Sequence, residues 1–97
     1  MRHEIILAPE AIEDLKRLDA RSRATVKSAL ETHLRHEPAK TSKSRIKRLR
    51  GIRRPEFRLR VDDIRVFYDV SGRAVEVLAI VRKDRARDRL TAWGKTE

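Results

Sequence analysis

Apolar side chains recur along this chain with two different periods, which divide it into a helical part and a strand part. A short apolar run at residues 4–7 suits a first strand, and Pro9 suits the first turn of a helix that follows it. Asp19 can cap a second helix, which must end before Pro38. The short connection between the two predicts an antiparallel helical hairpin. The apolar stripes at helical spacing are Ala11, Ile12, Leu15 and Leu18 in the first helix, and Val26, Ala29, Leu30 and Leu34 in the second.

Beyond a loop at residues 38–44 and a short basic segment that ends at Gly51, apolar and polar residues alternate. This alternation predicts two strands, residues 57–61 and 64–70, joined by a tight turn at Asp62 and Asp63. One side chain in two then points away from the helices. Those side chains are Arg58 and Arg60 on the first strand, and Arg65, Phe67 and Asp69 on the second.

The last part of the chain completes the predicted fold. The nearly continuous apolar run Ala74–Val81 predicts the central strand, and Ala86, Leu90 and Trp93 mark one face of a short C-terminal helix. The order of elements predicts an α+β fold, in which an N-terminal helical hairpin packs on one face of a small antiparallel β-sheet. The 97 residues suffice for a single domain, residues 1–97, with a modest core.

The positive charge of the chain is confined to one segment. Residues 1–39 have no net charge, residues 40–60 hold ten basic residues and one acid, and residues 61–97 have a net charge of +1. Clustered Lys and Arg side chains repel one another, so this confinement indicates a surface that faces a polyanion. A solvated basic face that only aids solubility is the alternative.

Several classes of protein are disfavoured by the composition. The absence of cysteine excludes a disulfide framework and a thiolate metal site. His33 and His36 have no third ligand nearby in the sequence, so we expect no metal and no cofactor. No apolar run approaches the ~20 residues that span a bilayer, and we therefore expect a cytoplasmic protein without a membrane partner.

The strand pattern places three guanidinium groups, those of Arg58, Arg60 and Arg65, side by side on one open face. The donor fork of arginine matches the geometry of a phosphate group, so we expect an RNA or DNA backbone as ligand. Basic residues where the last strand becomes the final helix are expected to close the same concavity: Arg82, Lys83 and Arg85. Further phosphate contacts are expected from the basic segment: Lys47, Arg48, Arg50, Arg53 and Arg54.

Catalytic groups are harder to find on this face. RNA cleavage by its own 2′-hydroxyl needs a base, an acid and stabilisation of the charged phosphorane, and arginine supplies only the last. The titratable groups nearby are Lys83, Tyr68 and Asp69, of which Tyr68 should point inward. We expect Phe57, Tyr68 and Trp93 in the core and consider Phe67 as a stacking platform for a base.

Four sequence words, KRLRG, FRLRV, IRVFY and VEVLAIVRKD, occur in an order and spacing that resemble the RelE/ParE superfamily of bacterial type II toxins. The resemblance covers nearly the whole chain. It implies one of two activities, since RelE-type toxins are messenger RNA endonucleases of the ribosomal A site and ParE-type toxins poison DNA gyrase. It also implies a small cognate antitoxin as partner.

The resemblance to the RelE type implies a set of catalytic residues. Arg58 and Arg60 match the alternating basic residues of one strand, and Arg65 matches the arginine of the next. A further basic residue after the last strand matches Lys83, or else Arg82 or Arg85. Many RelE-type toxins also carry a tyrosine near the C-terminal end, where this chain has Leu90 and Trp93.

Three functions therefore stand as hypotheses. The first is a ribosome-dependent mRNA endonuclease, with the ribosome and mRNA as partners and weak activity alone. The second is a ParE-like inhibitor of DNA gyrase, in which the basic segment contacts protein or DNA. The third is a non-catalytic, basic nucleic-acid-binding module on the same fold.

Overall fold

The computed structural model describes residues 2–94, so both ends of the predicted domain 1–97 lie outside the described residues. None of the helices in this part of the chain is long and apolar enough to cross a membrane. In chain order the elements are β1 (Glu4–Leu7), α1 (Pro9–Arg17), α2 (Ala20–Leu34), β2 (Ile46–Arg48), β3 (Phe57–Val61), β4 (Ile64–Ser71), β5 (Ala74–Arg82) and α3 (Lys83–Ala92).

The five strands form one mixed sheet in the order β1-β5-β4-β3-β2. The pairs from β2 to β5 are antiparallel as predicted, whereas β1 pairs with β5 in parallel. The middle position belongs to β4 and not, as predicted, to the apolar run Ala74–Val81, which lies in β5. The edge strand β2 arises within the segment that the sequence marks only as basic. These differences concern pairing between distant segments, on which a local apolar pattern carries no information.

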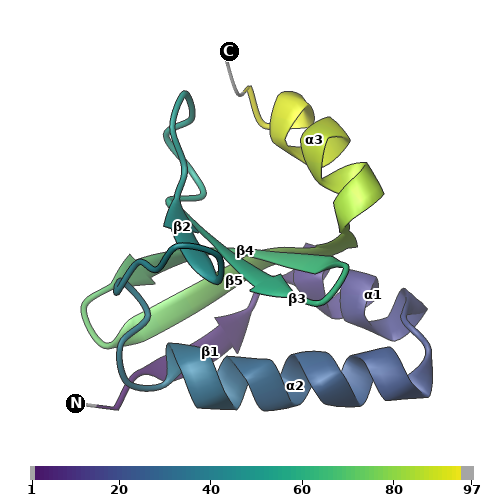
Figure 1. Ribbon diagram of the computed structural model, residues 1–97, viewed down its shortest axis with the longest axis horizontal. Helices are drawn as coiled ribbons and strands as arrows, with labels where there is room; N and C mark the ends of the chain where they lie inside the picture. The colour runs from purple at the N-terminus through teal and green to yellow at the C-terminus, as the bar shows by residue number, and fades with distance from the viewer. Residues whose placement is uncertain (1, 95–97) are drawn as a thin grey trace.

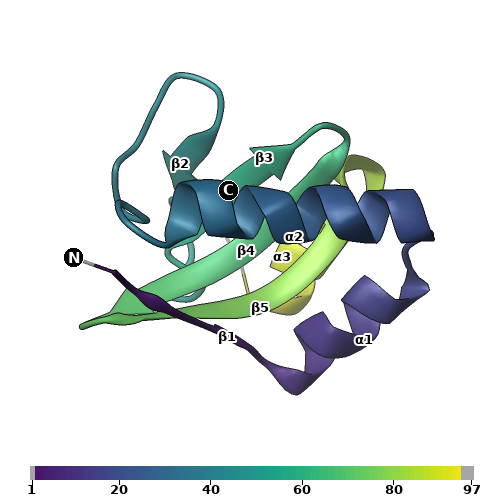
Figure 2. The ribbon, with the colours of Figure 1, turned by 90° about the horizontal axis from the view of Figure 1, so that it is seen from below.

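Helices α1 and α2 lie on one face of the sheet, and α3 lies on the other (Figures 1 and 2). The predicted stripe of α2 is confirmed, because Val26, Leu30 and Leu34 are all buried in the main core against β3, β4 and β5. The predicted cap is also confirmed, since the backbone N–H of Ser22 donates to Asp19 Oδ1 at 2.7 Å. The main core therefore fills the space between the helical pair and one sheet face.

The predicted buried face of α1 needs a correction. Ile12 is 42% exposed, whereas Asp14, a charged residue outside the predicted apolar stripe, is only 5% exposed. Asp14 accepts a bidentate hydrogen bond from Arg89 of α3, at 3.0 and 3.1 Å, and a third from the backbone N–H of Ile80 at 3.0 Å. A buried carboxylate is tolerated when charged and neutral donors satisfy it in this way. The ion pair joins α1 to α3 across the end of β5.

The second face of the sheet carries a smaller core under α3. Phe67 is fully buried there and meets the ring of Trp93 edge-to-face, with 5.8 Å between ring centroids. The hypothesis of Phe67 as a stacking platform is therefore wrong, because α3 covers the ring. Phe57 and Tyr68 lie in the main core as predicted, and the Tyr68 hydroxyl donates to the carbonyl of Pro38 at 2.7 Å.

Candidate phosphate-binding groove

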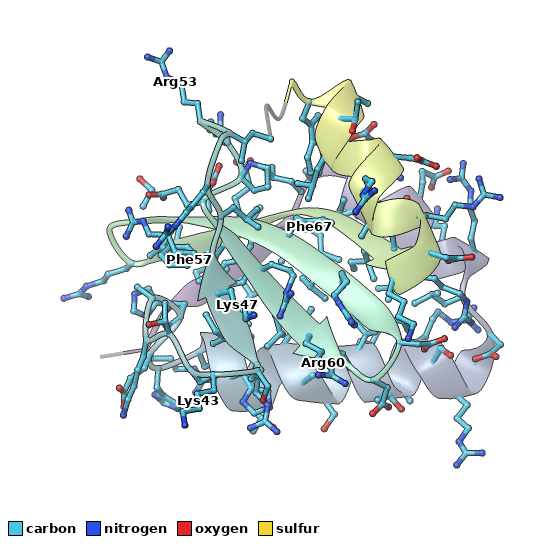
Figure 3. All side chains as sticks on the ribbon, turned by 45° about the horizontal axis from the view of Figure 1, so that its top comes forward. Lys43, Lys47, Arg53, Phe57, Arg60 and Phe67 are labelled. Carbon is cyan, nitrogen blue, oxygen red and sulfur yellow. The ribbon has the colours of Figure 1, made fainter. Side chains whose placement is uncertain are left out.

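Strand register brings the predicted basic side chains together on the face that α3 leaves open. Arg60 of β3 stands opposite Arg65 of β4, and Lys47 of β2 stands opposite Arg58 of β3. Figure 3 shows Lys47 and Arg60 on the strands beside α3, with Arg53 projecting from the loop between β2 and β3. Like charges in cross-strand positions destabilise a sheet, so this arrangement needs a compensating anion.

A groove of about 240 Å³ separates these strands from α3. Its walls are the sheet face, the start of the β2–β3 loop and one side of α3, and its lining combines guanidinium groups with apolar side chains but includes no carboxylate. The lining residues are Leu49, Arg58, Arg65, Phe67, Ala86, Arg87, Leu90 and Thr91.

The electrostatics of the groove disfavour an empty state. Partial burial lowers the pKa of Arg58, and the neighbouring charges of Arg65 and Arg60 lower it further. Partial burial and then Arg60 likewise lower the pKa of Arg65, against a smaller opposing effect of Asp63. Both guanidinium groups remain charged at neutral pH, because arginine does not deprotonate in proteins. An anion that enters would offset the repulsion between these charges and would supply hydrogen bonds in place of lost water.

The hydrogen bonds of the two arginines leave donor capacity unused. Arg65 Nη1 donates to the carbonyls of Asp62 and Ile64 at 2.9 and 3.1 Å, which fixes its position at the hairpin turn. Arg58 Nη2 donates to the carbonyl of Ser44 at 3.2 Å, while its Nε is buried without a partner. Within residues 2–94, neither guanidinium forms an ion pair. Free donors of this kind suit phosphate oxygens.

Other predicted phosphate ligands are engaged elsewhere. Arg54 donates to Asp69 at 2.6 Å and to Glu76 at 2.8 Å, beyond the groove. Arg48 pairs with Glu56 at 3.3 Å. The exposed residues Lys47, Arg50 and Arg53 form no ion pair within residues 2–94.

The basic residues around the start of α3 do not line the groove. Arg82 pairs with Asp63 at 2.9 Å. Together with Arg85, it lines a separate groove of about 740 Å³ on the α1 side of α3. Lys83 is exposed, and its backbone N–H donates to the carbonyl of Asp63 at 2.7 Å. The strands and the helix start therefore do not form one continuous concavity lined by all of these side chains.

Two of the three titratable candidates are held away from the groove. Tyr68 lies in the main core, and burial raises the pKa of its hydroxyl far above its usual value. Asp69 is buried and accepts from Arg54 and from the backbone N–H of Glu56, the latter at 2.7 Å. Lys83 is the candidate whose side chain stays exposed, next to the strand end that carries Arg65.

Arg87 is the groove residue that the sequence pattern did not single out. It follows Ala86 and precedes Leu90 by three positions, so it borders the apolar stripe that seats α3 on the sheet. A residue that borders this stripe is expected at the edge of the contact between α3 and the sheet. The spacing from Ala86 and Leu90 could therefore have identified Arg87 from the sequence.

One comparison with known proteins identifies a family. A family model described as "ParE toxin of type II toxin-antitoxin system, parDE" matches residues 5–87. No curated protein matches the sequence.

Solved structures of toxins share the fold. The toxin–antitoxin complex RelBE2 from Mycobacterium tuberculosis matches with a TM-score of 0.70 and 23% identity, over 84% of this chain and 99% of that chain. The archaeal RelE–RelB complex from Pyrococcus horikoshii OT3 also has a TM-score of 0.70, with 20% identity over 88% and 99% of the two chains. The YoeB dimer from Staphylococcus aureus matches with a TM-score of 0.63 and 17% identity, over 84% of this chain and 97% of that chain. These likenesses establish the α+β fold.

Proposed function

The chain belongs to the ParE toxin family of type II toxin-antitoxin systems, and we propose that it is an endonuclease that cuts messenger RNA on the ribosome. The observation that carries this proposal is the groove between the sheet and α3. There, Arg58 and Arg65 present guanidinium donors with no acid partner among the described residues. The resemblance of the strand sequences to RelE-type toxins, which cut messenger RNA, supports an RNA target.

The proposed chemistry is attack of a 2′-hydroxyl on the adjacent phosphate of the message, which forms a 2′,3′-cyclic phosphate and breaks the bond from phosphorus to the 5′-oxygen of the next nucleotide. A base takes the proton of the 2′-hydroxyl, and an acid gives a proton to the leaving 5′-oxygen. The attack builds negative charge on the non-bridging phosphate oxygens as the phosphorane forms. Arg65, fixed by the hairpin carbonyls, and Arg58, which lines the groove beside it, stabilise that charge by hydrogen bonds in place before the reaction. Arg60, opposite Arg65, adds a third positive charge.

Proton transfer needs a group outside the arginine set, because guanidinium groups do not deprotonate. Lys83 is the proposed contributor: it does not line the groove, but its side chain is exposed next to the strand end that carries Arg65, whereas Tyr68 and Asp69 are held in buried hydrogen bonds. With no carboxylate or histidine lining the groove, the isolated protein should be a weak nuclease, and the ribosome should align the reacting atoms.

Binding along the RNA backbone is assigned to basic side chains around the groove. Lys47, Arg50 and Arg53, which are exposed and unpaired within residues 2–94, are the strongest of the proposed phosphate contacts. Contributions from the remaining proposed contacts should be smaller where an ion pair must first be exchanged. These remaining contacts are Arg48, Arg54, Arg82 and Arg85.

A cognate antitoxin is the proposed protein partner. The matching RelE structures are complexes with RelB antitoxins, and the basic face offers a site for a segment with carboxylate side chains. Charge reversal at Arg58 and Arg65 should weaken such a complex if the antitoxin covers this face.

Inhibition of DNA gyrase is the second candidate, because the matching family model is named for ParE. Purified translation with primer extension on the message, run beside a gyrase supercoiling assay, separates the two. Cleavage within codons on ribosomes supports the endonuclease, and loss of supercoiling with intact message supports gyrase as target.

The variant Arg65→Ala tests the site itself. The single-turnover cleavage rate at saturating protein should fall roughly 10²- to 10³-fold, the cost of one preorganised transition-state donor. Arg21→Ala is the matched control, because Arg21 is an exposed arginine on α2, across the sheet from the groove. Equal rates in wild type and Arg65→Ala would remove Arg65 from the active site.

A further inference from the structure

The helix α3 contributes its own cation to the groove. Arg87 lies on the side of α3 that faces Arg58 and Arg65 across the groove, between the apolar residues Ala86 and Leu90 that seat the helix. It is exposed and forms no ion pair within residues 2–94. Among the described residues its charge therefore has no ion-pair partner, unlike that of Arg89 two residues further on.

We propose that Arg87 is a third phosphate ligand of this groove, so that α3 and the sheet hold one phosphate group of single-stranded RNA from opposite sides. This inference rests on the proposed function for the identity of the ligand. The groove lining holds three guanidinium groups and no carboxylate, so an anion that enters would compensate their mutual repulsion. Donors from two directions surround a phosphate more completely than those of the two strands alone.

The rest of the lining favours a single strand over a duplex. Leu49, Ala86 and Leu90 place apolar surface beside the cations, and the whole groove measures about 240 Å³. Such a recess can accept one phosphate group with part of its nucleoside. The bases of a double helix cannot enter the recess, because they stay stacked inside the duplex. The ligand is therefore an unpaired stretch of RNA.

The position of Arg87 is fixed from the other side of α3. Arg89 forms the bidentate ion pair with buried Asp14, and the guanidinium of Arg89 also lies 5.8 Å from the centroid of the Trp93 ring. Together with the seating of Leu90 on Phe67, these contacts hold the helix against the sheet before any ligand enters. A ligand group held in advance loses less conformational entropy on binding.

Binding of an RNA that cannot be cut tests the proposal apart from catalysis. The probe is a fluorescent single-stranded RNA with 2′-O-methyl groups, which lacks the attacking hydroxyl, and its anisotropy is measured with the full chain at several salt concentrations. Arg87→Ala should weaken binding roughly 10- to 100-fold, the value of a hydrogen-bonded charged contact. The slope of log affinity against log salt should fall by about 0.7, the contribution of one phosphate contact on a single strand.

Two further variants make the result specific. Arg87→Lys keeps the charge without the donor fork, so it should keep the wild-type salt slope and recover only part of the affinity. Arg73→Ala removes the same charge from the exposed β4–β5 turn and should leave both affinity and slope unchanged. Unfolding by urea should be alike in all four proteins, because Arg73 and Arg87 make no buried contact.

The outcomes separate this inference from the proposed function. Wild-type protein that cuts messages while Arg87→Ala binds the probe as tightly as Arg73→Ala overturns the role of Arg87 alone. Arg87-dependent binding by a protein that cuts no message supports the ligand site and overturns the endonuclease assignment. Wild-type protein that cuts messages but binds no probe overturns the ligand site and leaves the endonuclease assignment standing, whereas wild-type protein that neither binds the probe nor cuts messages overturns both.

Discussion

Removal of the Arg89 side chain should loosen α3, because the ion pair with Asp14 is the main polar contact between this helix and the rest of the fold. In Arg89→Ala the carboxylate of Asp14, 5% exposed, keeps only the N–H of Ile80 as a close donor. Loss of one partner from a buried pair costs about 3–5 kcal/mol. The Arg89 side chain is 22% exposed and Arg17 stands 3.8 Å from the same carboxylate, so we take the lower end, about 3 kcal/mol.

A loss of this size is easily measured in a chain of 97 residues. It corresponds to a fall of about 12–24 °C in melting temperature, by the usual scaling for small domains. Trp93, the single tryptophan, packs against Phe67 beneath α3, so its fluorescence reports the seating of this helix. Both signals are followed during unfolding by urea: the fluorescence of Trp93 reports the helix α3, and circular dichroism reports the whole fold.

Arg17→Ala is the matched control, because Arg17 approaches the same carboxylate from a side chain that is 76% exposed. It should cost less than about 1 kcal/mol, as exposed pairs do. The double variant Asp14→Asn with Arg89→Ala should recover part of the loss, since no unpaired charge stays buried. If Arg89→Ala costs no more than Arg17→Ala, the ion pair does not hold α3 and the reasoning fails.

Three further predictions concern other parts of the fold. Arg54→Ala should lower the free energy of unfolding by about 1 kcal/mol, since Asp69 loses a charged donor that is itself largely exposed. The same variant should change the salt dependence of RNA binding less than Arg53→Ala does. Tyr68→Phe should cost about 1–2 kcal/mol in urea unfolding, because the buried carbonyl of Pro38 loses its donor. Burial, and then the charge of Arg45, lower the pKa of His33 below the ordinary value of 6.5. The free energy of unfolding should therefore be highest above pH 6.5 and decline as the pH falls through this value, because the unfolded chain binds the proton more readily. His33→Gln should flatten that part of the pH profile.

Local periodicity was sufficient to predict most of the elements and the arginine face. Alternation in residues 57–61 and 64–70 predicted which side chains share a face, and the strand register confirms that Arg60 stands opposite Arg65. The helical stripe of Val26, Leu30 and Leu34 was predicted in the same way. Both patterns depend only on the fixed geometry of helix and strand, so they can be recognised in a sequence without knowledge of its tertiary contacts.

What the sequence did not reveal depends on contacts between distant segments. Alternation sends Phe67 to the arginine side but cannot show that α3 returns to cover it. The charge of Asp14 predicts exposure, and only its pairing with Arg89, 75 positions away, explains its burial. Arg54 was grouped with the phosphate ligands by its place in the basic segment, although Asp69 and Glu76 lie across from it in the fold.

The main core and the arginines of β3 lie on opposite sides of the same strand. Strand β3 buries Phe57 and Leu59 against the helices, while Arg58 and Arg60 on its other side add no apolar area to the main core. Replacement of these arginines therefore changes the ligand at little cost to folding, so the face can diverge during evolution while the sheet is retained. This separation offers a physical reason why one chain matches both a family named for ParE and solved structures named for RelE and YoeB.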